Sequence, residues 1–162
     1  MESKIGIMLD LPDDKLPGFY AQLVKALAGK AQLFDRDKEM LIVSSDDQQQ
    51  AVLDIMAHYK VETEIMALCL VPDDAELADL FSDYGFISRS EHAYLYESLI
   101  RVFRLVPANE RADIASAKQQ MDEHVLAQWS TDGHETFVVD RQLEELMHGI
   151  AKAYRCQIDV QL

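Results

Sequence analysis

The first 71 residues alternate apolar and polar positions in an order that predicts strand, helix, strand, strand, helix, strand. Ile and Leu occupy every second position of residues 4–11, the period of a strand with one apolar face. Residues 14–28 and the stretch after Ser45 instead place apolar side chains three and four positions apart, as an amphipathic helix does. Short apolar runs on both sides of the charged residues 35–38 predict a hairpin. This order predicts a ferredoxin-like βαββαβ sheet over residues 1–72.

The last strand of that sheet, residues 62–71, is apolar on both faces, because Ile65 and Cys69 point one way while Met66 and Leu68 point the other. Two helices cover only one face of such a sheet, so we expect the second half of the chain to cover the other face. Apolar spacing predicts helices in that half and a closing strand-helix-strand unit. The predicted helices span 74–84, 90–106 and 109–129, and the closing unit spans 136–162. The predicted fold class is therefore α+β, with residues 73–162 and 1–72 packed as one compact domain.

Composition narrows the class of protein. The 162 residues are 49% hydrophobic and 27% charged, which is typical of a globular chain and argues against disorder. No apolar run approaches the roughly 20 residues of a membrane-spanning helix, and no secretory leader is visible, so we expect a cytoplasmic protein without membrane contact. Cys69 and Cys156 each lie in an apolar strand pattern, which predicts buried free thiols rather than a secreted disulfide framework.

The charge balance is strongly negative, because 29 Asp and Glu residues against 15 Lys and Arg give a formal net charge of −14. Such a surface repels nucleic acid backbones, and no local basic patch is visible, so direct nucleic acid binding is not expected. The glycines lack the spacing of a phosphate-binding loop, and no serine or cysteine nucleophile has a recognisable motif. These observations favour a protein that is not an enzyme and uses no cofactor.

Pairs of aspartates recur where predicted strands give way to helices. Carboxylates at such positions cap helix N-termini and face the positive end of the helix dipole. The predicted topology adds a second role, because the end of the first strand and the hairpin turn share one edge of the sheet. That edge gathers Asp10, Asp13, Asp14, Asp35 and Asp37. We predict that this acidic edge binds and modulates a basic partner protein, as an inhibitor, an immunity protein or a DNA mimic does.

Two alternatives use the same region. Acids at the end of a first strand and in the following hairpin resemble the placement of metal ligands in polymerase palm and nucleotide cyclase domains. This resemblance implies phosphoryl transfer, with Asp10 and Asp35 or Asp37 holding divalent cations. Leu16-Pro17-Gly18 is similar to the proline-glycine turn that leads into the first helix of small-molecule-sensing ACT domains, although here it comes several residues later, after Asp13 and Asp14. That resemblance implies a regulatory module, a pocket beside Pro17 and Gly18, and a homodimer.

Overall fold

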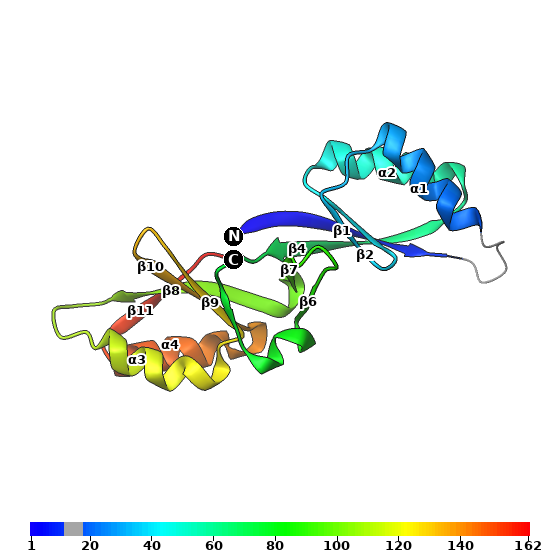
Figure 1. Cartoon of the computed structure of the whole chain (residues 1–162). Helices are drawn as coiled ribbons and strands as arrows, with labels where there is room; N and C mark the ends of the chain where they lie inside the picture. The colour runs from blue at the N-terminus through cyan, green and yellow to red at the C-terminus, as the bar shows by residue number, and fades with distance from the viewer. Residues whose placement is uncertain (12–17) are drawn as a thin grey trace. The chain divides into compact units, whose positions relative to one another are not determined.

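The structure is a computed structural model that describes residues 1–11 and 18–162 (Figure 1). The fold is mixed α+β, with four α-helices and two antiparallel sheets in the described residues. The chain forms two compact units: unit 1 contains residues 1–70 and 87–94, and unit 2 contains residues 71–86 and 95–162. The chain therefore passes from unit 1 to unit 2, returns for the short segment 87–94, and leaves again. No helix among the described residues is long and apolar enough to cross a membrane.

Unit 1 follows the element order that the hydrophobic pattern predicts. Its elements are β1 (Glu2–Asp10), α1 (Gly18–Lys30), β2 (Asp35–Asp37), β3 (Met40–Val43), α2 (Asp46–His58) and β4 (Glu62–Leu70). The strands pair in the order β2-β3-β1-β4, and all these pairs are antiparallel. Figure 1 shows α1 and α2 on one face of this sheet. Buried Leu23, Leu27 and Ile55 of the helices pack there against Ile7 and Leu41 of the strands.

The same sheet continues past β4 with β7 (Ala93–Tyr96) and β6 (Gly85–Ile87), so that β2 and β6 are its two edge strands. Ser88 follows directly after β6, and its hydroxyl donates to the Asp35 carboxylate on β2 at 2.6 Å. A flat sheet would hold its two edges too far apart for this bond, so the sheet is curled toward the face that is opposite to the helices.

Unit 2 is built around the second sheet. Its elements are β5 (Glu76–Leu77), the 3₁₀ turn η1 (Asp79–Asp83), η2 (Glu97–Leu99), β8 (Ile100–Pro107), α3 (Ile114–Met121), η3 (Asp122–His124), β9 (Ala127–Thr131), β10 (His134–Asp140), η4 (Arg141–Leu143), α4 (Glu144–Ala153) and β11 (Cys156–Val160). The strand order is β11-β8-β10-β9-β5. Phe103 and Phe137 of the sheet pack against Met121 and Met147 of the helices to form the core of this unit.

The elements of unit 2 from β8 to β11 repeat the order of unit 1. Each set runs strand, helix, strand, strand, helix, strand, and the strand order β9-β10-β8-β11 corresponds to β2-β3-β1-β4. The helix before the last strand also uses the same inward positions: Val52, Ile55 and Met56 in α2, and Met147, Ile150 and Ala151 in α4. The chain therefore contains a structural repeat, which the hydrophobic pattern did not reveal.

Both of these helices end in the same way. Tyr59 and Tyr154 are the C-cap residues, and each is followed by a basic residue with a left-handed backbone, Lys60 at φ 55° and Arg155 at φ 60°. The amides of Lys60 and Arg155 each donate to a carbonyl of the preceding turn at 3.1 Å. This is the hydrogen bond of a Schellman-type helix end, where glycine is the usual residue.

The helices predicted over 74–84 and 90–106 are wrong. The first segment forms β5 and η1, and the second forms β7, η2 and β8. Strand β8 lies between β10 and β11 and is apolar on both faces, so its spacing fits a helix as well as a buried strand. The third predicted helix, 109–129, is also too long, because α3 and η3 end at His124 and β9 follows. The closing strand-helix-strand unit is present as β10, α4 and β11.

Candidate functional site

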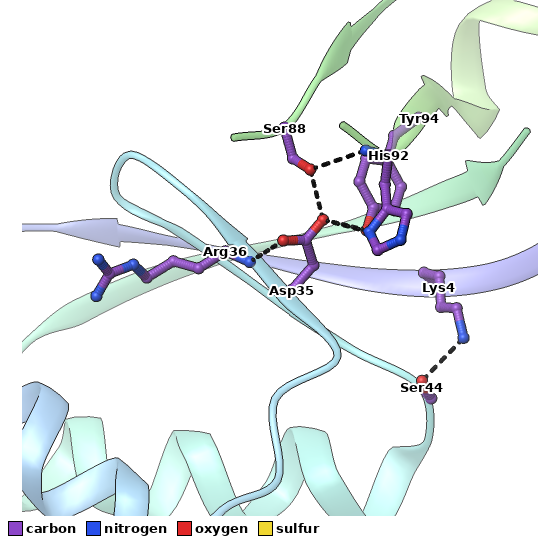
Figure 2. A network of polar contacts seen from close by, with 7 residues as sticks. All are labelled: Lys4, Asp35, Arg36, Ser44, Ser88, His92 and Tyr94. Atoms are coloured by element: carbon purple, nitrogen blue, oxygen red, sulfur yellow. Dashed lines mark hydrogen bonds and ion pairs between the residues drawn. The ribbon is translucent and has the colours of Figure 1, made fainter. Parts of the chain in front are cut away.

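A buried carboxylate, that of Asp35, lies at the centre of the polar contacts in unit 1 (Figure 2). Its side chain is 2% exposed. One oxygen, Oδ2, accepts from the Ser88 hydroxyl at 2.6 Å, the Tyr94 hydroxyl at 2.7 Å and Nδ1 of His92 at 3.0 Å. The other oxygen accepts from the backbone amide of Arg36 at 2.7 Å. The carboxylate therefore links the segment 87–94 to the edge strand β2.

The strand register explains why Asp35 points inward. Asp35 is paired with Ile42 on β3, and Ile42 is paired with Gly6 on β1, so the three residues share one face of the sheet. This face is opposite to that of Ile7 and Leu41, which pack under the helices. The Asp35 side chain thus lies on the inner side of the curled sheet, where residues 87–94 return.

Hydrogen bonding decides the charge of Asp35. Burial is the largest single influence and raises the pKa, but the bonds from Ser88, Tyr94, His92 and the Arg36 amide together lower the pKa from 3.8 to about 2. Burial, and then the bond to this carboxylate, raise the pKa of Tyr94 above its ordinary value. Asp35 is therefore an acceptor at neutral pH, and Nδ1 of His92 carries the proton that it donates.

A cation lies on the same face of the sheet. Lys4, which is 7% exposed, places its Nζ 3.8 Å from the centre of the Phe34 ring, 2.9 Å from the Ser44 hydroxyl and 3.2 Å from the Glu2 carboxylate. The Phe34 ring in turn stacks on the His92 imidazole, with centroids 5.2 Å apart. The imidazole is thus fixed by a carboxylate on its edge and by an aromatic ring on its face.

The contacts among Asp35, Ser88, His92 and Tyr94, which we call the Asp35 cluster, fit the anchoring of segment 87–94 better than catalysis. The Ser88 hydroxyl donates to Asp35 rather than to His92, so the three residues do not form the serine-histidine-carboxylate relay of hydrolases. Nε2 of His92 has no bonding partner among the described residues, and the His92 side chain is 32% exposed. The only group that the cluster offers to solvent for proton transfer is therefore this half-exposed imidazole.

A second feature of unit 1 is a set of carboxylates on the face of the sheet opposite to the helices, where β1 ends and β4 begins. Asp10 is paired with Glu62 across β1 and β4, Met8 is paired with Glu64, and Asp37 with Met40. The register places Asp10, Asp37, Glu62 and Glu64 on the face opposite to the helices, and we call these four residues the acidic face. None of the four forms an ion pair or a hydrogen bond through its side chain with any described residue.

Only some of the predicted site residues lie where the sequence analysis expects them. Asp10 and Asp37 lie at the expected edge, because the Leu9 amide donates to the Glu39 carbonyl in the hairpin turn at 2.9 Å. Asp35 is buried and is not part of an open acidic edge. Gly18 is exposed at the start of α1. The remaining predicted residues, Asp13, Asp14 and Pro17, lie outside the described residues.

Sequence reasoning missed most of the contacts that surround Asp35. His92 and Tyr94 are two positions apart, which is the spacing of one strand face, but the helix predicted over 90–106 hid this signal. Glu62 and Glu64 carry the same period-2 signal in a strand that was correctly predicted. Ser88 has no comparable signal, because its role depends on a partner 53 positions away.

The sulfur and metal chemistry of the chain adds no further site. Cys69 and Cys156 are buried free thiols, as the sequence predicts. Within residues 1–11 and 18–162, no group of three or more His, Cys, Asp or Glu side chains is arranged to hold a metal ion. Comparison with known proteins gives no matching family model, no matching curated protein and no matching solved structure.

Proposed function

We propose that this protein is non-catalytic and that it binds and modulates a basic partner protein through the acidic face of unit 1. The observation that carries the proposal is the pairing of Asp10 with Glu62. Like charges directly opposite each other on antiparallel strands destabilise a sheet, and no described cation offsets this pair. A partner that supplies Lys or Arg side chains would turn this local repulsion into attraction and steer the encounter.

Methionines between the carboxylates support the proposal. Half-buried Met8 and Met66 and buried Met40 share the inner face with the four acids. Methionine side chains are flexible and polarizable, so they adapt to irregular partner surfaces. Charge would then bring the partner to this face, and the thioether side chains would supply apolar contact. An inhibitor, an immunity protein and a DNA mimic are the forms of such a protein that the charge balance favours.

The experiment compares two variants of equal net charge. In the first, the acidic face is neutralised by Asp10→Asn, Asp37→Asn, Glu62→Gln and Glu64→Gln. In the control, four exposed acids of unit 2 are changed instead: Glu110→Gln, Asp122→Asn, Glu123→Gln and Asp132→Asn. Proteins that wild type captures are purified, and their association rates are measured singly at increasing ionic strength.

A basic protein that binds wild type and the control, associates more slowly as salt rises, and fails to bind the neutralised face would support the proposal. Equal binding by the two variants would contradict it, because charge at this particular face would then not matter.

We also propose that each repeat is a ferredoxin-like unit, and this favours a second candidate function, an ACT-like regulatory module. The order β4-β1-β3-β2 with both crossover helices on one face, present in both halves, supports the assignment. Thermal unfolding in the presence of single amino acids and nucleotides tests this candidate. A ligand at 100 times its Kd should add about 2.7 kcal/mol to the free energy of unfolding. The absence of any stabilising small molecule in that panel would remove this candidate.

A further inference from the structure

A hollow of about 580 Å³ opens in unit 2 beside the C-terminal end of α4. Three parts of the repeat contribute to it: the last turns of α4, the connection from β8 to α3, and the start of β11. The polar side chains that line it are Asn109, His148, Lys152, Arg155 and Gln157. No Asp or Glu is among the lining residues, although acids outnumber bases by 29 to 15 in the chain.

The two permanent cations of this hollow are not used by the fold. Neither Lys152 nor Arg155 forms an ion pair or a side-chain hydrogen bond with any described residue. Two other cations of unit 2 are paired, since Arg101 contacts Glu144 at 2.7 Å and Lys118 contacts Glu135 at 2.8 Å. Two free cations at one hollow, in an acidic unit, leave positive charge available to a bound anion.

Hydrogen bonds hold the backbone of the two residues that carry these cations. Lys152 follows His148 by one helical turn, so both side chains lie on one face of α4. Arg155 has the left-handed φ of 60° at a position that favours glycine. Its amide donates to the Lys152 carbonyl at 3.1 Å, and its own carbonyl accepts from the Ala108 amide at 3.0 Å. These bonds tie Arg155 to both the helix and the β8–α3 connection.

Three features oppose an anion here, and each is offset in part. The C-terminal end of a helix carries partial negative charge, but the amides of Tyr154 and Arg155 already bond to the carbonyls of Ala151 and Lys152. Burial raises the pKa of the lining residue Cys156, and the negative charge of Asp113 adds to this effect, but the Asp113 carboxylate accepts two hydrogen bonds from Ser116. The carboxylate nearest to His148 is that of Glu144, at 3.9 Å. Glu144 also accepts a shorter bond, of 2.7 Å, from Arg101, which is not among the residues that line the hollow.

We propose that this hollow binds a phosphomonoester. A phosphomonoester carries nearly two negative charges at neutral pH and three strong acceptor oxygens, which match one guanidinium and one ammonium. The amides of Asn109 and Gln157 provide further donors, and Ile158 and Ala108 provide apolar contact for the organic part of the ligand. The inference goes beyond the proposed partner binding and does not depend on it, because the acidic face belongs to unit 1.

The test is a titration of the full-length ¹⁵N-labelled protein followed by backbone amide chemical shifts. Inorganic phosphate and AMP serve as phosphate-bearing probes, and adenosine serves as the probe without phosphate. We expect saturable shifts at Asn109 and at residues 152–158 with the phosphate-bearing probes and none with adenosine. The double variant Lys152→Gln/Arg155→Gln should bind at least about tenfold more weakly, because it removes charge-assisted hydrogen bonds. The control Lys118→Gln, which alters a cation outside the hollow, should bind as wild type does.

A second variant separates loss of the cation from loss of the fold. Arg155→Gly removes the guanidinium and suits the left-handed backbone, so it should fold and bind more weakly. Three results would each overturn the proposal: no saturable shift with either phosphate-bearing probe, equal shifts with adenosine, or unchanged binding by a folded variant that lacks Arg155.

Discussion

Removal of the Asp35 side chain should destabilise the protein more than removal of any exposed acid. In Asp35→Ala, the buried hydroxyls of Ser88 and Tyr94 both lose a charged acceptor at 2.6–2.7 Å. A buried donor that loses such an acceptor costs about 1–3 kcal/mol, whereas the half-exposed His92 can turn to water at little cost. We therefore expect the free energy of unfolding to fall by about 3–5 kcal/mol. Urea unfolding at neutral pH, followed by far-ultraviolet circular dichroism, measures the change.

The pH dependence of the Asp35 contribution has a defined sign. The pKa of Asp35 is lowered from 3.8 to about 2 in the folded protein, so the ionised form stabilises the fold by about 2 kcal/mol. This stability is fully present above the unfolded pKa and is lost as the pH falls through the folded pKa. The difference in free energy of unfolding between wild type and Asp35→Asn should therefore narrow by about 1 kcal/mol between pH 5 and pH 3.

Half-buried Asp37, two positions further along β2, provides the control, because its side chain forms no hydrogen bond or ion pair with any described residue. Asp37→Ala should change the free energy of unfolding by no more than about 0.5 kcal/mol, as is usual for a side chain outside the core that has no bonding partner. The reasoning would be refuted if Asp35→Ala stayed within 1 kcal/mol of wild type at neutral pH. It would also be refuted if the difference between wild type and Asp35→Asn did not change between pH 5 and pH 3.

Two further predictions concern the backbone. Gly6→Ala should lower the free energy of unfolding by about 1–2 kcal/mol, measured by urea titration, because the new Cβ would lie 2.9 Å from the fully buried Leu68 side chain; an unchanged midpoint would contradict this. Lys60→Gly should raise the melting temperature, with a gain of up to about 1 kcal/mol, because glycine adopts the φ of 55° after α2 without strain. A lower melting temperature would show that the Lys60 side chain has a stabilising contact.

The predicted fold was most accurate where local pattern and tertiary environment agree. Between β1 and β4, each strand alternates or is closed by turn residues, and each helix has one apolar stripe, so periodicity identified every element. It failed at β8, where Val102 and Phe103 are both buried on opposite faces. An apolar run of this kind has no period that separates strand from helix, and only the pairing with β10 and β11 decides its state.

One part of the candidate site could be predicted from the sequence, and the other part could not. The acidic face follows from sequence, because Asp10, Glu62 and Glu64 sit in strands whose alternation fixes the face on which each residue lies. The role of Asp35 does not follow, because the sequence shows only an acid beside a turn. Its burial depends on Ser88 and Tyr94, which return to unit 1 after the chain has passed through unit 2.

The sequence by itself determined the local elements of unit 1, the negative charge of the surface and the burial of both thiols, since each depends on neighbours in the chain or on composition. Only the tertiary structure decided the curl of the first sheet, the repeat in unit 2 and the two free cations beside α4. The physical reason is that hydrogen bonds between distant strands set which residues meet, and periodicity along the chain carries no information about those partners.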